Sequence, residues 1–285
     1  MPVIDLHFHS SYSGGKLTIP ELAVLIKKIG LKYCSLTDHD TVDGVSELQE
    51  YLKGYDIIVI PGIELTALYK QQEIHILAYD FEIDKITKVL RKKQKITEQK
   101  KINELKLAKR LFKQNGFAVS NNLKAKKGQP AGLTIALDVY YNPKNLKKIN
   151  GQSPEQFYNS YQAPGAPCYT ERSGVGVEWI IDNFKKISND LILAHPFNPV
   201  SYLIKPLKIK DIKCLVGMGL DGIEVYHPDL SDKQINILKN LAQKNNWYFT
   251  GGSDYHGHEK NNNKQLGYIK DKFIIDSFKL HGYTK

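Results

Sequence analysis

The chain has little cysteine, no long hydrophobic run and no repeated or low-complexity tract. Its three cysteines, Cys34, Cys168 and Cys214, are odd in number and far apart, which favours reduced thiols over a disulfide framework and argues against a thiolate zinc site. No stretch approaches the roughly 20 apolar residues that span a bilayer, and the first residues lack the basic and apolar segments of a signal peptide. These absences predict a cytoplasmic protein without a membrane segment.

Negative charge is scarce in one region of the chain. The 285 residues carry a net charge of +10, with 40 Lys plus Arg against 30 Asp plus Glu. From Lys85 to Asn150 there are 18 basic and three acidic residues, so this segment holds +15 and the remainder −5. The segment is either a solvated helix face or a positive field that attracts an anionic substrate such as a phosphate or a nucleic acid.

What the sequence does contain is an alternation of apolar strands and amphipathic helices. Helical spacing of apolar residues occurs at 19–29, 45–52, 177–184 and 231–243. Such alternation is typical of an α/β fold with a parallel sheet buried on both faces. The apolar runs predict seven strands, the first at Val3-Ile4 and the others at 33–36, 56–64, 73–79, 191–194, 222–227 and 247–250.

A basic segment interrupts this alternation. Residues 84–114 predict one long helix, and residues 121–161 predict short helices without a convincing strand. We therefore interpret residues 1–83 and 173–285 as one α/β barrel. Residues 84–172 would be a mainly helical insertion that serves as a lid or substrate subdomain.

Two histidines stand at the end of the first predicted strand. His7 and His9 are separated by one residue, so alternation along a strand would place both imidazoles on one face. A single strand histidine is usually a surface residue or a satisfied core residue. Two imidazoles turned toward an interior need a partner for both lone pairs, so this pair is a candidate set of metal ligands.

Further imidazoles and carboxylates follow the other predicted strands. Without a cation, their convergence would bury unpaired charges and unsatisfied polar atoms. Imidazole and carboxylate ligands without thiolate suit Zn, Mn or Fe, and their number exceeds what one ion needs. The predicted multinuclear metal site consists of His7, His9, His39, Glu64, His75, His195, Asp254 and His256.

The segments that carry these residues resemble, in order and spacing, the motifs of the PHP (polymerase and histidinol phosphatase) superfamily. They are Asp5-Leu6-His7-Phe8-His9-Ser10, Thr37-Asp38-His39-Asp40, Pro61-Gly62-Ile63-Glu64, Ala194-His195-Pro196 and Gly252-Ser253-Asp254-Tyr255-His256. The resemblance covers essentially the whole chain, since stand-alone metal-dependent phosphoesterases of this superfamily carry an insertion at the same place. It implies a distorted seven-stranded, TIM-like (β/α)7 barrel with two to three divalent ions, Mn, Fe or Zn.

The resemblance also implies how the ligands are shared. By matching positions, His7, His9, Glu64 and Asp254 would hold one ion, Glu64, His75 and His195 a second, and His39 and His256 would serve a third. The family usually provides an Asp for the third ion in its first motif, and Gly14 stands at that position. The third site would therefore be weak, empty, or completed by water, substrate or Asp40.

The insertion departs from the family as well. Related phosphoesterases tend to have an Arg-Pro-His-like element that reaches the substrate phosphate, whereas this chain has Gln129-Pro130-Ala131-Gly132. Lys126, Lys127 or Arg172 could anchor the phosphate instead, unless the substrate differs. His227 is a candidate substrate contact or, as readily, a hydrogen-bond partner of the ligands.

These residues predict a metal-dependent phosphoesterase. Two cations sharing Glu64 would lower the pKa of a bridging water and present hydroxide to a phosphate ester. His39, Asp254 and His256 are the predicted catalytic residues, with a protonated His39 or His256 assisting the leaving alkoxide as general acid. The substrate would be a small phosphorylated metabolite, a nucleotide or an oligonucleotide end, and the basic insertion could bind nucleic acid.

Two other functions stay open. Amidohydrolase barrels, which cleave C–N bonds, also begin with His-x-His, but no strand-end lysine is placed to act as a carbamylated bridging ligand. Gly14 and the basic insertion also fit a nucleic-acid-binding barrel without catalysis. Salt-sensitive binding of RNA or DNA without turnover would distinguish that barrel from an enzyme.

Overall fold

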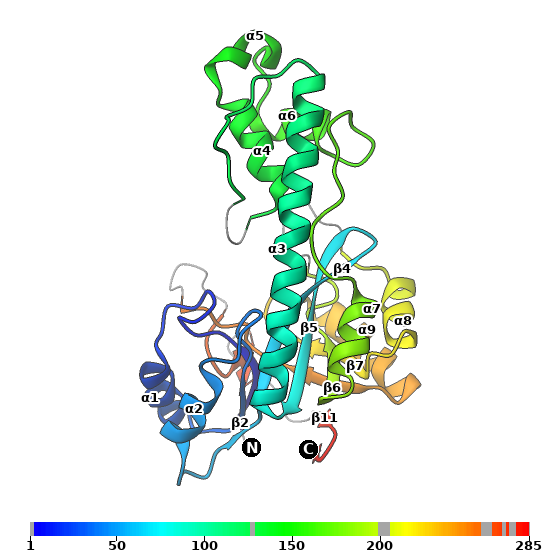
Figure 1. Cartoon of the computed structure of the whole chain (residues 1–285). Coiled ribbons are helices and arrows are strands. Elements are labelled where there is room, and N and C mark those ends of the chain that lie inside the picture. Colours follow the sequence, from blue (N-terminus) through cyan, green and yellow to red (C-terminus); the bar gives the residue numbers. More distant parts are fainter. Residues whose placement is uncertain are drawn as a thin grey trace. The chain divides into compact units, whose positions relative to one another are not determined.

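The computed structural model describes residues 3–125, 129–198, 206–257, 264–269, 272–273 and 278–284 (Figure 1). The chain groups into two compact units. The larger unit contains residues 1–69, 73–91 and 176–285, and the smaller unit contains residues 70–72 and 92–175. All the predicted metal ligands belong to the larger unit.

Three parallel strands form the first sheet of the larger unit. In order they are β1 (Val3–Phe8), β2 (Leu31–Leu36) and β3 (Ile58–Val59). Helices α1 (Ile19–Ile29) and α2 (Val45–Leu52) provide the crossovers that parallel strands need. Both helices confirm the spans predicted from the spacing of apolar residues.

A second sheet of the larger unit has seven strands. In spatial order they are β12 (Tyr283–Thr284), β11 (Lys279–Leu280), β8 (Tyr248–Gly251), β7 (Gly222–Tyr226), β6 (Ser188–Leu193), β5 (Gln72–Phe81) and β4 (Gly62–Tyr69). β6, β7 and β8 are mutually parallel, whereas β5 is antiparallel to β6 and β11 is antiparallel to β8. A short separate pair contains β9 (Tyr268–Ile269) and β10 (Lys272–Phe273).

Helices alternate with the parallel strands of this second sheet. They are α7 (Val177–Phe184) before β6, α8 (Ile209–Gly217) before β7 and α9 (Asp232–Asn245) before β8. α7 and α9 agree with the predicted helices, whereas α8 was not expected from the sequence. The structure thus confirms the α/β alternation.

The expected single closed barrel of seven parallel strands is not found among the described residues. The ladders form separate sheets, and isolated bridges pair Phe8 with Tyr255 and His39 with Glu64. One cause is Pro61, which has no N–H for a ladder and separates β3 from β4 within the expected strand at 56–64. The sheet is interrupted there rather than continuous.

A tight turn explains a second difference from the expected parallel sheet. Lys70 and Gln71, between β4 and β5, both have positive φ, 50° and 62°. This backbone is that of a two-residue hairpin turn, which joins consecutive strands without a helical crossover. β5 consequently runs antiparallel to β6.

Fully buried side chains from neighbouring strands hold β1 in place. Ile4 and Leu6 pack in one cluster with Leu77, Tyr79 and Ile192, and none of the five is exposed. The Tyr79 hydroxyl donates a hydrogen bond to the Leu6 carbonyl at 2.7 Å. Burying each of these aliphatic side chains stabilises the fold by about 1.5–3 kcal/mol. The strand that carries His7 is therefore anchored on the side away from the polar residues.

The smaller unit is helical. Helix α3 (Ile83–Gln114) confirms the predicted long helix, and residues 92–114 of it belong to this unit. With it pack α4 (Ala131–Tyr140), η1 (Pro143–Asn145), α5 (Leu146–Ile149) and α6 (Pro154–Tyr161). The shared apolar core consists of Leu105, Ala108, Phe112, Phe117, Ala131, Ile135, Ala136, Val139, Ile149, Phe157 and Cys168.

One buried carboxylate links segments of the smaller unit. Glu104 accepts hydrogen bonds from the backbone N–H groups of Gly132 at 2.8 Å and Ser173 at 3.0 Å, and from the Ser173 hydroxyl at 2.5 Å. It therefore ties α3 to the start of α4 and to residue 173, so its role is structural.

In the parts of the chain that the structure describes, no helix is both long and apolar enough to cross a membrane.

Candidate metal centre

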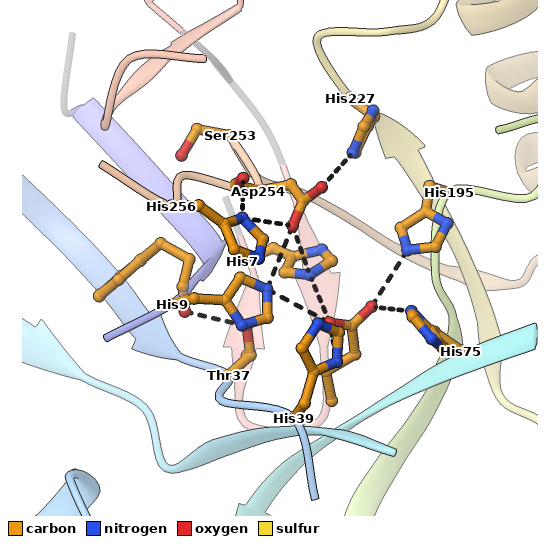
Figure 2. A network of polar contacts seen from close by, with 12 residues as sticks. His7, His9, Thr37, His39, His75, His195, His227, Ser253, Asp254 and His256 are labelled. Carbon is orange, nitrogen blue, oxygen red and sulfur yellow. Dashed lines mark hydrogen bonds and ion pairs between the residues drawn. The ribbon is translucent and has the colours of Figure 1, made fainter. Parts of the chain in front are cut away.

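The predicted ligands point toward one another from several strands of the larger unit (Figure 2). Parallel strands deliver the residues that follow them to the same edge of a sheet, which is where α/β proteins build their sites. His7 lies in β1 and His9 directly after it, His39 follows β2, Glu64 lies in β4, His75 lies in β5, His195 follows β6, and Asp254 and His256 follow β8.

Two glycines let these strands approach closely. A Cβ at Gly62 would lie 2.0 Å from the Ser35 hydroxyl oxygen, and a Cβ at Gly252 would lie 2.2 Å from the Cβ of His7. Glycine at position 62 lets β4 approach β2, so that Glu64 pairs with His39. Glycine at position 252 brings the segment after β8 against β1 in the same way.

Three buried side chains and the partly exposed Asp254 form the first candidate ligand set. The His9 Nε2 atom lies 3.1 Å from Asp254 Oδ1 and 3.2 Å from Glu64 Oε2. His7 Nε2 lies 3.4 Å from the same Glu64 oxygen and 3.6 Å from the same Asp254 oxygen. One ligand atom from each of the four residues lies within 4.8 Å of the others, as expected around one cation. This set is the one that the family resemblance implies.

Glu64 also faces a second set through its other oxygen. Glu64 Oε1 lies 2.7 Å from His75 Nδ1 and 3.1 Å from His195 Nε2. His39 Nδ1 lies 3.0 Å from Glu64 Oε2, and His39, Glu64 and His75 form a set within 4.8 Å. The two oxygens of one carboxylate therefore face two neighbouring sets of imidazoles, which is the geometry of a bridging ligand. His39 joins this second set in addition to the third set, to which the sequence resemblance assigned it.

The third set contains no carboxylate. His9, His39 and His256 have ligand atoms within 4.8 Å of one another. Burial and the neighbouring His9 lower the pKa of His256 to about 4. Gly14 lies directly beside it, since a Cβ at Gly14 would be 3.5 Å from His256 Cδ2. The residue at which the family usually has a carboxylate is thus next to the third set in space.

Two unsatisfied atoms test whether the first set fits a cation. Among the residues that the structure describes, His7 Nε2 and Glu64 Oε2 are buried and make no hydrogen bond, although the His39 and His9 nitrogens lie 3.0 and 3.2 Å from the Glu64 oxygen. A buried lone pair and a buried carboxylate oxygen without partners are costly in a folded protein. They lie 3.4 Å apart. A divalent cation coordinated by both would remove this cost, so the residues fit such an ion.

Opposite charges determine the ionisation of the site. Burial by itself raises the pKa of the Glu64 carboxyl, but His75, His7 and His39 outweigh it and hold this pKa well below its ordinary value. Burial by itself lowers the pKa of His7, but the carboxylates of Glu224 and Glu64 raise this pKa well above its ordinary value. The site therefore keeps its carboxylates ionised although they are buried, and positive charge must balance them.

Glu224 is a functional residue that sequence reasoning missed. Its Oε1 atom lies 2.9 Å from His7 Nδ1, and its Oε2 atom accepts a hydrogen bond from the His195 backbone N–H at 2.7 Å. An ionised carboxylate can only accept, so His7 carries a proton on Nδ1, and Nε2 would be the ligand atom once a cation takes the place of its proton. The available sequence signal was a single Glu within the apolar strand Ile223-Glu224-Val225, and the structure buries this side chain fully.

Two further acidic side chains, Asp5 and Asp38, hold serines that lie next to the candidate ligands. Asp5 accepts hydrogen bonds from the Ser253 hydroxyl at 2.6 Å and the Ser253 backbone N–H at 3.0 Å, which fixes the residue before Asp254. Asp38 accepts from the Ser13 hydroxyl at 2.5 Å, and that hydroxyl lies 3.4 Å from His9 Nδ1. The Ser13 oxygen can therefore accept a hydrogen bond from His9 Nδ1–H, which leaves Nε2 as the candidate ligand atom.

Backbone conformation at two ligands is unusual. His195 and Asp254 have positive φ, 27° and 49°, which residues with a side chain rarely adopt. Such conformations persist where surrounding structure imposes them, and they cluster at functional sites. The fold thus holds these two side chains toward the other ligands at a conformational cost.

Of the four residues predicted to contact substrate, only His227 lies beside the candidate ligands in the described structure. His227 is fully buried, its Nδ1 accepts a hydrogen bond from the Asp229 backbone N–H at 3.2 Å, and its Nε2 lies 3.4 Å from Asp254 Oδ2 (Figure 2). This placement fits a supporting hydrogen-bond role. Arg172 belongs to the smaller unit, where its backbone N–H donates to Gln71. Lys126 and Lys127 lie outside the described residues.

Comparisons with known proteins agree with this geometry. Residues 5–132 match the PHP domain. The chain is 24% identical over 256 residues to a 5'-3' exoribonuclease of Haemophilus influenzae, covering 88% of this chain and 89% of that protein. It is 26% identical over 255 residues to a phosphoribosyl 1,2-cyclic phosphate 1,2-diphosphodiesterase of Eggerthella lenta, covering 89% and 94%.

A solved structure shares the fold. It is that of a candidate metal-dependent phosphoesterase from Bifidobacterium adolescentis, with a TM-score of 0.61 at 21% identity. The match covers 96% of this chain and 92% of that one. Residues 5–132 therefore resemble the PHP domain in sequence, and the chain as a whole shares the fold of the solved phosphoesterase structure.

Proposed function

We propose that the chain hydrolyses phosphate esters with divalent metal ions bound at this site. The observation that carries the proposal is the convergence of buried imidazoles and carboxylates around His7 Nε2 and Glu64 Oε2, which have no hydrogen-bond partner among the described residues. The reaction class is supported by the names of the two curated relatives, an exoribonuclease and a phosphodiesterase.

Two neighbouring ligand sets would hold the ions. His7, His9, Glu64 and Asp254 would hold one, and Glu64 with His75 and His195 a second, with His39 at the boundary between them. When bound, such ions stabilise the charge on a phosphoryl group as Lewis acids and lower the pKa of water. Ligands of this type suit Mn, Fe or Zn.

The chain's own residues orient and complete the site. Glu224 holds the His7 ring through Nδ1, and Ser253 positions Asp254 through its contacts with Asp5. The His39 side chain is 32% exposed and lies at the edge of the site, so we propose it as the general acid that protonates the leaving alkoxide. The His256 Nδ1 atom donates to the Asp254 carbonyl at 2.8 Å, which leaves Nε2 as an acceptor.

For the substrate we propose an RNA end or a nucleotide in preference to an uncharged ester. The exoribonuclease relative and the charge of +15 between residues 85 and 150 support this choice. The helical insertion would then contribute phosphate contacts, with Arg172, Lys126 and Lys127 as the candidates.

The proposal is tested with protein stripped of metal and reloaded with Mn, Fe or Zn. The assay panel contains a 5′-phosphorylated RNA oligonucleotide, a nucleoside bisphosphate and a phosphoribosyl cyclic phosphate, with N-acyl amides as the contrasting class. We expect metal-dependent release of nucleotide or inorganic phosphate. Protein of verified metal content that cleaves no phosphate ester, or cleaves only amides, would contradict the proposal, as would salt-sensitive RNA binding without turnover.

A further inference from the structure

We propose that Lys264 forms a binding subsite for a phosphoryl oxygen of the substrate at the rim of the metal centre, an inference that rests on the proposed function. The Lys264 Nζ atom lies 2.5 Å from Asp254 Oδ2 and 3.2 Å from Asp229 Oδ2. Its side chain is 24% exposed, so Lys264 is partly open to solvent while its ammonium contacts a candidate metal ligand.

The two oxygens of Asp254 have different neighbours. Oδ1 lies 3.1 Å from His9 Nε2 and faces the first ligand set. Oδ2 faces Lys264 and His227 Nε2, which lies 3.4 Å away. Because the His227 Nδ1 atom accepts the Asp229 N–H, its proton is on Nε2 and is directed at Asp254. The outer oxygen therefore already has a neutral donor besides the ammonium.

The charge balance leaves Lys264 available for an anion. A divalent ion on Oδ1 shares the negative charge of Asp254, so Asp254 neutralises the ammonium only in part once the centre is loaded. Asp229 is the second carboxylate beside Lys264, and it also accepts a hydrogen bond from Asn198 Nδ2 at 2.9 Å. An ammonium has three N–H donors, and two of them face these carboxylates within the described structure. The third donor can meet an incoming oxygen.

The ligand class follows from this chemistry. Lysine binds phosphate as a compact point charge, and a hydrogen bond between an ammonium and an anionic oxygen is stronger than a neutral one. A non-bridging phosphoryl oxygen of a substrate or of product phosphate is such an anion. The subsite would hold this oxygen, while the remaining phosphoryl oxygens would lie toward the metal centre.

The test uses full-length protein loaded with metal and inorganic phosphate as the probe. Calorimetry measures the phosphate Kd of wild type and of Lys264→Met, which keeps most of the side-chain length and removes the charge. The matched control is Lys32→Met, because Lys32 pairs with Asp56 on an exposed surface of the same unit. Elemental analysis measures the bound metal of each variant.

We expect Lys264→Met to weaken phosphate binding about tenfold or more, the effect of one charged hydrogen bond, with wild-type metal content. Lys32→Met should bind phosphate as wild type does. Asp229→Asn removes the competing carboxylate charge and should bind phosphate at least as tightly as wild type, whereas a purely structural ion pair predicts weaker binding.

Three results would overturn the subsite. The first is a phosphate Kd of Lys264→Met within twofold of the wild-type value. The second is loss of metal from Lys264→Met, which would show that Lys264 only supports Asp254. The third is weaker phosphate binding by Asp229→Asn. Ester turnover by the wild type is measured separately. Absence of turnover with an intact phosphate difference would refute the proposed function and leave the subsite standing.

Discussion

The first and third ligand sets of the metal centre have similar geometry and different chemistry. Each places its ligand atoms within 4.8 Å of one another, and both include His9. The first set adds the carboxylates of Glu64 and Asp254 to its imidazoles, whereas the third has imidazoles alone, with Gly14 beside His256. Because anionic ligands hold hard divalent cations best, carboxylates rather than the number of imidazoles should decide which sets hold an ion.

The largest expected effect comes from removing the shared carboxylate. Glu64→Gln takes away the anionic oxygens that face both the first and the second set. We expect loss of both ions and a fall in kcat/KM of about a thousandfold or more, which corresponds to several kcal/mol of lost Lewis-acid stabilisation. Elemental analysis and steady-state kinetics measure the two effects.

The control for this variant is Glu50→Gln, which changes an exposed carboxylate that pairs with Lys53. It should keep the metal content and activity of the wild type. Retention of two ions by Glu64→Gln would show that the imidazoles and Asp254 hold the metals without the Glu64 charge, and it would contradict the role assigned to this carboxylate.

A smaller effect is expected from the residue behind His7. Glu224→Gln removes the charge that holds the His7 Nδ1 proton, but it keeps a side chain of the same size. Outer partners of metal-bound histidines typically contribute about 10–100-fold in metal affinity, so we expect a loss of that size. Metal titration measures it, with the exposed Glu155→Gln in the smaller unit as control. Unchanged metal affinity would mean that the Glu224 charge does not support His7 as a metal ligand.

Adding a carboxylate to the third set sharpens the comparison further. Gly14→Asp should add one bound ion, because its side chain would lie beside His256 and a Cβ there makes only ordinary contacts. Gly14→Asn is the matched control, since it has the same shape without the charge. Elemental analysis counts the ions. An unchanged count in Gly14→Asp, or an increase in both variants, would contradict the role assigned to the carboxylate.

The sequence predicts the ligands better than it predicts the sheet. His7, His9 and Asp254 were recognisable as candidate ligands because they lie in short local motifs, and the geometry brings them together. Glu224 was not assigned, because its role depends on a contact with His7 that is 217 residues away in sequence. A long-range contact of this kind leaves no local spacing to recognise.

The direction of the strands was predicted less well for a different reason. The turn at Lys70 and Gln71 requires positive φ at both residues, and such turns usually contain Asn or Gly. Neither residue type is present, so nothing in the local sequence marked a hairpin. Pro61, by contrast, was visible in the sequence, and its missing N–H explains the break between β3 and β4.

The smallest expected effect is on stability. A chelator removes ions that bind the folded chain only, and ligands at about 100 times their Kd stabilise by about 2.7 kcal/mol. For a chain of this size we expect the Tm to fall by about 5 °C in the wild type. The Tm of Glu64→Gln should not respond to the chelator. An equal fall in both proteins would place the stabilising ions away from Glu64.

The central claim is that carboxylates select the occupied ligand sets, and anomalous diffraction from crystals of the manganese-loaded protein tests it most directly. The account predicts one peak among His7, His9, Glu64 and Asp254 and a second at Glu64 beside His75, with none beside His256. A peak among His9, His39 and His256 with the first set empty would contradict it.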